Sequence, residues 1–394
     1  MRSFLPMLLV FLGLGWLVSE SPASGLNVTG TITVGAGPTG VAFLPDGSRA
    51  YVTNSSSNSV SVIDTATWTV AATISVSGNP TGIAASATRV VVNTTNATGH
   101  PITIIDPVTN TVTSTISLSA ILSDEGIAIK ADGSVAWVVV GTKLARVDLN
   151  TNNVVYSTDA VMNYTHLAID PSSTYGFVTS YNSHTISRFD ISNLAFVPSV
   201  PASSSAVIGL DYSPNGSTLY VADCGGASVL VYDVASLTLT ASISVPGCPY
   251  GIDVDPTGSN VFVSRLSGGK VSVIDTSTNT VTEEISVGAQ PKWLAVSPSG
   301  DALYVANYSS NSISVIDLTS LLPTTTSTST TTTLPATTTT TNVSTGNQVS
   351  TTTSPAAPLP TTGRRDDSNA AVVLLTAGIG LLVATRRRAA RPTS

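Results

Sequence analysis

Residues that could perform acid–base or metal chemistry are few in this chain. It contains only three histidines, His100, His166 and His184. His166 and His184 lie close enough along the chain to Glu125 for the three to meet after folding. A protein zinc site needs three or four such ligands, and no metal-ligand spacing is present, so we predict no metal site. Because no P-loop, EF-hand, zinc-protease or serine-elbow motif occurs either, we predict no cofactor and assign no catalytic residue.

The two cysteines, Cys224 and Cys248, are separated by 24 positions. No C-x-x-C pair and no haem-attachment motif is present. The start of the chain predicts export into an oxidising compartment, where disulfides persist. We therefore predict a Cys224–Cys248 disulfide, which stabilises by about 3 kcal/mol in the chain-entropy account.

Aspartate recurs at a nearly constant interval of 42 or 43 residues. The seven positions are Asp64, Asp106, Asp148, Asp190, Asp233, Asp275 and Asp317. Each precedes a turn rich in polar residues, where an aspartate can accept backbone N–H hydrogen bonds. Active sites break symmetry, whereas these residues preserve it, so we interpret them as turn residues and not as catalysts.

The elements that carry these residues form a repeat of about 42 positions. Each unit shows four short stretches of alternating apolar and polar residues, separated by turns such as Pro45-Asp46-Gly47. Alternation with period two predicts strands, and four strands per unit of this length predicts propeller blades. The fold class is therefore predicted as all-β, a seven-bladed propeller over residues 26–322.

The strand count also predicts how the ring closes. The seventh unit ends after Asp317 without a fourth strand, and the segment Thr31–Val34 precedes the first unit and matches a fourth strand. We predict that this N-terminal strand completes the last blade, because ring closure removes exposed sheet edges.

The repeat resembles the YVTN β-propeller family of secreted and surface-layer proteins of prokaryotes. The motif stands at residues 51–54, 220–223, 262–265 and 304–307, whereas residues 90–93 and 137–140 depart most from it. The resemblance covers about three quarters of the chain. It implies the propeller fold and a binding or structural role, but it does not fix an activity.

Departures from the repeat indicate a candidate ligand face. The loops after the second and fourth strands of each unit should emerge on one face, around the central channel. The candidate residues on that face are Glu125, Tyr164, His166, Tyr181, His184, Tyr250, Arg265, Lys292 and Trp293. Tyr308 and His100 fall there too, and we expect His100 to be exposed. The aromatic residues either form a stacking surface for sugars or a peptide, or pack on their own blades.

Both ends of the chain resemble processing segments. Residues 1–23 combine Arg2, an apolar run and Ser21-Pro22-Ala23, which predicts a cleaved signal peptide. Residues 323–358 are mostly Thr, Ser and Pro, which predicts a disordered, extended stalk. Hydroxyl groups of this stalk are plausible glycosylation sites.

The last segment resembles the LPXTG cell-wall sorting signal of Gram-positive bacteria. Leu359-Pro360-Thr361-Thr362-Gly363 is followed by a tail, residues 364–394, with an apolar stretch at 370–384 and a basic end. The resemblance implies cleavage between Thr362 and Gly363 by a sortase, which transfers Thr362 to peptidoglycan through an acyl-enzyme. The apolar stretch is predicted to form a hydrophobic helix that anchors the chain transiently in the membrane. The alternative is a permanent membrane anchor.

Net charge excludes some partners. The formal charge is −7, with 16 basic and 23 acidic residues, but seven of the basic residues and only three acidic ones lie in the two ends. The part between is therefore strongly acidic and repels nucleic acid and anionic membranes.

Together these observations predict a secreted propeller linked covalently to the wall of a Gram-positive bacterium. Its leading function is a displayed binding, adhesion or structural module for an extracellular ligand, either a glycan or a protein. The alternative is an extracellular lactonase-type hydrolase that uses the channel face, with Glu125, His166 and Arg265 as first suspects.

Overall fold

The computed structural model describes residues 25–96, 99–118, 126–158, 164–197, 200–202 and 206–322. Contacts divide the chain into two units, residues 1–326 and 327–394. The predicted signal peptide, stalk, sorting motif and C-terminal helix lie outside the described residues. Within those residues the only helical segments are three short 3₁₀ turns, and none has the length or apolar character of a membrane span.

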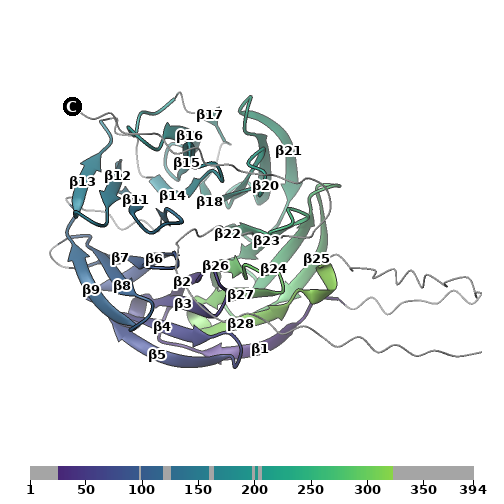
Figure 1. Ribbon diagram of the computed structural model, residues 1–394. Coiled ribbons are helices and arrows are strands. Elements are labelled where there is room, and N and C mark those ends of the chain that lie inside the picture. The colour runs from purple at the N-terminus through teal and green to yellow at the C-terminus, as the bar shows by residue number, and fades with distance from the viewer. Residues whose placement is uncertain are drawn as a thin grey trace, which may run out of the picture. The chain divides into compact units, whose positions relative to one another are not determined.

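The described chain folds into seven four-stranded antiparallel sheets arranged as blades around a central channel (Figure 1). This confirms the predicted all-β, seven-bladed propeller.

Blade 1 contains β2 (Pro38–Phe43), β3 (Arg49–Asn54), β4 (Ser59–Asp64) and β5 (Thr69–Ser75). Blade 2 contains β6 (Asn79–Ala85), β7 (Val90–Thr95), β8 (Ile102–Asp106) and β9 (Thr111–Ile116). Blade 3 contains β10 (Ile127–Ile129), β11 (Val135–Val140), β12 (Lys143–Asp148) and β13 (Asn153–Tyr156). Blade 4 contains β14 (Tyr164–Ile169), β15 (Tyr175–Ser180), β16 (Thr185–Asp190) and β17 (Val200–Pro201). Blade 5 contains β18 (Val207–Tyr212), β19 (Thr218–Asp223), β20 (Ser228–Asp233) and β21 (Thr238–Ser244). Blade 6 contains β22 (Pro249–Val254), β23 (Asn260–Arg265), β24 (Lys270–Asp275) and β25 (Thr280–Ser286), and blade 7 contains β26 (Pro291–Val296), β27 (Ala302–Asn307), β28 (Ser312–Asp317) and the N-terminal β1 (Val28–Thr33). The 3₁₀ turns are η1 (Ser55–Ser57), η2 (Tyr308–Ser310) and η3 (Thr319–Leu321).

Both faces of a blade are buried against its neighbours, which explains the apolar runs in the second and third strands. In blade 1, Val60 and Val62 pack with residues of blade 2. Val52 and Ile63 pack on the opposite face, against Tyr304 of blade 7. Since alternate side chains of a strand point to opposite faces, a sheet between two neighbours needs apolar residues at both kinds of position.

The asparagine that ends the repeat motif ties the second strand to the third. In blade 1 the Asn54 side-chain amide donates to the hydroxyls of Ser59 (3.2 Å) and Ser61 (2.9 Å). Asn307 in blade 7 makes the same two bonds with its own serines. The repeated Asn and Ser-x-Ser are therefore one interaction across a hairpin.

The periodic aspartates hold the turns between third and fourth strands. Asp64 accepts the backbone N–H groups of Ala66 (3.1 Å) and Thr67 (3.0 Å), and Asp275 accepts those of Ser277 and Thr278. Hydrogen bonds lower the pKa of both carboxyls, chiefly the bond from the Ser277 hydroxyl for Asp275 and the bond from the Thr67 amide for Asp64. The turn interpretation drawn from the sequence agrees with this geometry.

The N-terminal strand closes the ring as the seventh blade's outer strand. β1 pairs antiparallel with β28, so that Thr31 lies opposite Ser314 and Ile32 opposite Ile313. Figure 1 shows purple β1 beside green β28, although they come from the two ends of the described chain. Leu26 and Ile32 are buried, and the Leu26 amide donates to Glu283 of blade 6.

Deleting residues 26–35 is expected to destabilise the protein strongly. The deletion exposes the edge of β28 and removes Leu26 and Ile32, whose burial contributes about 3–6 kcal/mol together. Urea unfolding followed by circular dichroism measures the loss. Removing the ten residues 385–394 is the control, and we expect it to leave the free energy of unfolding unchanged. Equal unfolding curves for the two deletions would contradict the closure argument.

Candidate functional site

The innermost strand of each blade walls the central channel. A cavity of ≈ 220 Å³ lies within this wall and is lined by residues of β2, β6, β10, β14, β18, β22 and β26. The side chains with functional groups come from blades 4 to 7: His166, Asp211, Asp253 and Trp293.

Neighbouring innermost strands approach so closely that some positions require glycine. A Cβ atom on Gly209 would lie 2.3 Å from the Tyr250 carbonyl oxygen, and one on Gly251 would lie 2.6 Å from the Lys292 carbonyl oxygen. Two blades carry a large side chain at the equivalent position, His166 in blade 4 and Trp293 in blade 7. These are the positions where the channel wall departs most from the repeat.

His166 and Trp293 stack on each other although blades 5 and 6 separate them in sequence. Their ring centroids are 4.1 Å apart and their planes are 23° from parallel. Tyr250 of blade 6 meets Trp293 edge-on at 5.5 Å. The aromatic residues predicted for this face thus touch one another, which the sequence left undecided between mutual stacking and packing on their own blades.

Lys292 and Tyr308 extend this group to five residues. The Lys292 ammonium nitrogen lies 5.6 Å from the Tyr250 ring centre and 5.0 Å from that of Tyr308. Both distances are within the range of cation–π attraction. We call the five residues His166, Tyr250, Lys292, Trp293 and Tyr308 the entrance cluster.

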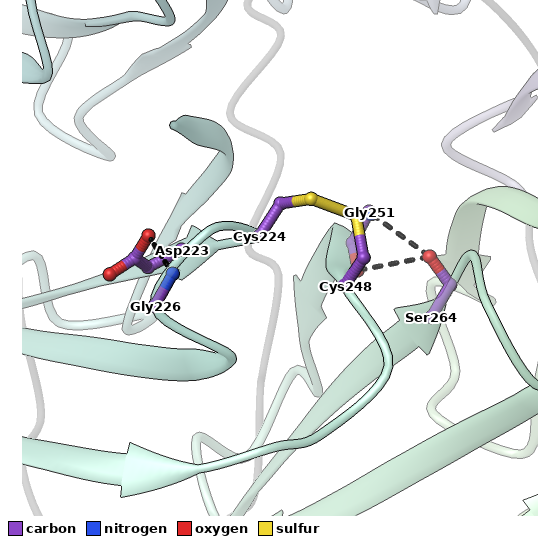
Figure 2. Close-up of a disulfide and its surroundings, with 6 residues drawn as sticks. All are labelled: Asp223, Cys224, Gly226, Cys248, Gly251 and Ser264. Atoms are coloured by element: carbon purple, nitrogen blue, oxygen red, sulfur yellow. Dashed lines mark hydrogen bonds between the residues drawn. A yellow bond between two sulfur atoms is a disulfide. The ribbon is translucent and has the colours of Figure 1, made fainter. Parts of the chain in front are cut away.

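A disulfide fixes the loop that leads to Tyr250. Cys224 follows β19, and Cys248 directly precedes the first residue of β22; their sulfur atoms are bonded (Figure 2). Figure 2 also shows the Ser264 hydroxyl beside Gly251, whose amide donates to it at 2.9 Å. The start of β22 is therefore held from both sides.

Other residues assigned to the ligand face do not join the entrance cluster. Arg265 is buried and forms an ion pair with Glu284 of the outermost strand, and Lys270 pairs with the same carboxylate at 2.6 Å. Within the described part of the chain, no hydrogen bond or ring contact links Tyr181 or His184 to the cluster. Glu125 and the Tyr164 side chain lie outside the described residues.

The expectation that His100 is exposed is wrong. Only 7% of its surface is accessible, and its Nδ1 atom lies 3.3 Å from the Thr95 hydroxyl. The polar loop around it suggested exposure, but the side chain folds back against β7.

Sequence analysis missed a pair of carboxyls in the channel wall, Asp211 and Asp253. They occupy equivalent positions in β18 and β22, where the other five innermost strands carry alanine (Ala42, Ala84, Ala128, Ala168 and Ala295). This departure from the repeat was visible in the sequence.

Each carboxyl of the pair reaches the next blade. Asp211 accepts the Val254 amide at 2.9 Å, and Asp253 accepts the Val296 amide at 2.7 Å. An innermost strand forms backbone hydrogen bonds with another strand on one edge only. The N–H groups on its other edge therefore need acceptors such as these carboxyls. The pair thereby connects blades 5, 6 and 7.

Burial raises the pKa of both carboxyls. For Asp253 the negative charge of Asp211 adds to burial and brings its pKa well above the ordinary value, whereas a hydrogen bond from Asp253 offsets part of the rise in the pKa of Asp211. Each side chain is partly accessible from the cavity, and the surrounding strands enclose the rest of it. Both shifts therefore favour a proton shared by the pair over two ionised carboxylates. A carboxyl beside a carboxylate can both donate and accept a proton.

Metal binding has no support in the described ranges, where no three His, Cys, Asp or Glu side chains lie close enough to share an ion.

Comparison with known proteins identifies the fold only. No protein-family model matches the chain, and no curated protein matches its sequence. Among solved structures, hydrazine synthase from Kuenenia stuttgartiensis matches with a TM-score of 0.64 and 20% identity, over 71% of this chain and 95% of that one. At this identity the match supports the propeller architecture and carries no activity to this protein.

Replacing Asp253 with Asn is expected to remove a pH dependence of stability. Because folding raises both pKa values, the pair's contribution is complete below about pH 4 and is lost as the pH rises through the folded-state pKa values. The wild-type free energy of unfolding should therefore fall between pH 5 and pH 8. The side-chain amide introduced by this substitution can still donate to Asp211 and accept from Val296, so D253N should show a flatter profile and higher stability at pH 8. Urea unfolding at several pH values measures both.

Asp275→Asn is the matched control. The pKa of this turn carboxyl is lowered, so its stabilising contribution is present above about pH 4 and lost below it. D275N should leave the slope between pH 5 and pH 8 unchanged. A wild-type profile that is flat over this interval would contradict the shared-proton assignment.

Proposed function

We propose that this protein is an exported binding module that is displayed on the cell wall and binds its ligand at the entrance cluster. The observation that carries the proposal is the continuous contact from His166 through Trp293 and Tyr250 to Lys292 and Tyr308. The propeller scaffold does not require these five residues, since other blades carry different residue types at the equivalent positions.

The cluster suits a ligand with a flat or apolar part and an anionic group. Aromatic faces provide stacking area at low entropic cost, and Lys292 places a positive charge in an otherwise acidic domain. An extracellular glycan or peptide that carries a carboxylate or sulfate has this chemistry. The disulfide before β22 supports the proposal because it limits the loss of loop entropy on binding.

Substituting Lys292 by Gln is expected to weaken binding of an anionic ligand about tenfold or more, because a hydrogen bond to a charged group contributes about 1.5–3 kcal/mol. Tyr308→Ala removes stacking area and should also weaken binding. Calorimetric titration with a panel of anionic oligosaccharides and acidic peptides measures this. Tyr181→Ala is the control, because Tyr181 is exposed on the same face and makes no contact with the cluster in the described residues.

Two results would count against the entrance cluster. One is an equal loss of affinity in Tyr181→Ala. The other is turnover of a lactone or ester that Asp253→Asn abolishes, which would favour the hydrolase alternative. That alternative now rests on the Asp211–Asp253 pair, since Arg265 is engaged by Glu284.

Display on the wall rests on the C-terminal signal. We propose that a sortase attacks the Thr362 carbonyl, releases Gly363 and the tail, and passes Thr362 to a peptidoglycan amine. Residues 370–384 hold the substrate at the membrane until that step.

Thr362→Ala is expected to prevent wall attachment. The protein should then be extracted from cells by detergent, whereas the wild-type protein should need a wall-digesting enzyme. Thr337→Ala, in the near-match 334–338 that lacks glycine, is the control and should behave as wild type. Release of T362A only by the wall-digesting enzyme would refute the sorting assignment.

A further inference from the structure

A second pocket lies at the junction of blades 7 and 1, on the face opposite the entrance cluster. Its volume is ≈ 490 Å³, within the range of small-molecule sites, about 300–1,000 Å³. It is formed by the turns that follow the first and third strands of both blades. The lining includes Asp46, Trp68, Asp301, Tyr304 and Asp317.

Trp68 occupies a position in its turn that suits other residues better. Its φ is +57°, in the left-handed region that is unfavourable for a bulky side chain. The equivalent residues Asn110, Asn152 and Asn279 share this conformation, which asparagine tolerates. Leu194, also equivalent, is buried, but Trp68 remains 42% exposed, so core packing does not explain it. A residue in a strained conformation that remains this exposed is a reason to look for function.

The Trp68 ring has a prepared support on β1. Its edge lies against Gly30, where a Cβ atom would come within 2.7 Å of the ring. The equivalent outer-strand residues are Ala72, Ser114, Ala241 and Glu283, each with a side chain that would occupy this space. Trp68 and Gly30 therefore both depart from the repeat at this junction. Trp68 supplies the ring, and Gly30 leaves the space that the ring occupies.

Tyr304 lacks the hydrogen bond that its counterpart makes. In the junction of blades 1 and 2, the Tyr51 hydroxyl bonds to the Asn110 side chain at 2.8 Å. At the junction of blades 7 and 1, Trp68 replaces that asparagine. The Tyr304 side chain is 1% exposed, and its hydroxyl has no hydrogen-bond partner among the described residues although it borders the pocket. Because it borders the pocket, the Tyr304 hydroxyl is available to donate or accept a hydrogen bond with a ligand there.

We propose that this pocket binds a neutral or amino-bearing carbohydrate, with one face of a pyranose ring on Trp68. The lining contains three carboxylates and several hydroxyls but no basic side chain, so it excludes anionic sugars. Asp46, Asp301 and Asp317 offer acceptors for sugar hydroxyls, and the Tyr304 hydroxyl completes the set. Two kinds of ligand could suit an acidic pocket: a carbohydrate, or a cationic side chain of a partner protein. Hydroxyl-bearing residues surround the half-exposed indole of Trp68, and this arrangement suits a ligand with many hydroxyls better than a single cationic group. This site is independent of the entrance cluster.

Calorimetric titration of the full-length purified protein tests the proposal. The probes are β-1,4-linked tetrasaccharides of glucose and of N-acetylglucosamine and the α-1,4-linked tetrasaccharide of glucose. We expect saturable binding of at least one probe, weakened tenfold or more in Trp68→Asn and measurably weakened in Tyr304→Phe. Lys292→Gln, on the opposite face, should bind as wild type, which separates this site from the proposed function.

Trp68→Asn also controls for folding. It introduces the residue that three other blades carry and can restore the bond to Tyr304, so its unfolding temperature should equal or exceed that of wild type. Absence of heat with every tetrasaccharide at about 10 mM, which is above the millimolar Kd of a weak complex, would overturn the proposal. So would undiminished binding in Trp68→Asn, or binding of a short oligolysine peptide in place of the sugars.

Discussion

The pairing of β1 with β28 is the contact on which the rest of the structure depends. Each blade buries both faces against its neighbours, so no blade is complete until the ring is closed. Pairing the N-terminal strand with the last blade joins the two ends of the domain and turns a linear row of sheets into a circle. The interior positions, the channel wall and the junction of blades 7 and 1 all take their geometry from that closure.

A closed repeat separates residues that preserve symmetry from residues that break it. Asn54 and Asn307 make the same bonds, and Asp64 and Asp275 hold the same turn. His166, Trp293, Asp253 and Trp68 break the pattern at positions where most other blades carry a smaller residue. Folding of the scaffold accounts for the residues that are repeated from blade to blade. The residues that differ from the repeat therefore identify the surfaces where selection for binding can act.

The aspartates illustrate how environment decides chemistry on one fold. Asp275 lies at the surface, where the Ser277 hydroxyl and backbone N–H groups donate to it, stabilise its charge and lower its pKa. Asp253 lies in the channel wall beside a second carboxyl, where burial and charge repulsion raise its pKa. Residue type is the same, yet the pKa is lowered at the turn and raised in the channel wall.

The sequence alone determined the architecture, because a repeat of fixed length with four period-two segments leaves one economical arrangement. It also predicted that the strand around Ile32 completes the ring, since the strand count required it. The carboxyl pair was readable as two aspartates among five alanines, but its significance depended on knowing that this position faces the channel. Only the tertiary structure decided that His166 meets Trp293, that Arg265 turns toward Glu284, and that the Trp68 ring lies against Gly30. These contacts join blades that are far apart in sequence, and closure of the ring sets their distances, which no local pattern encodes.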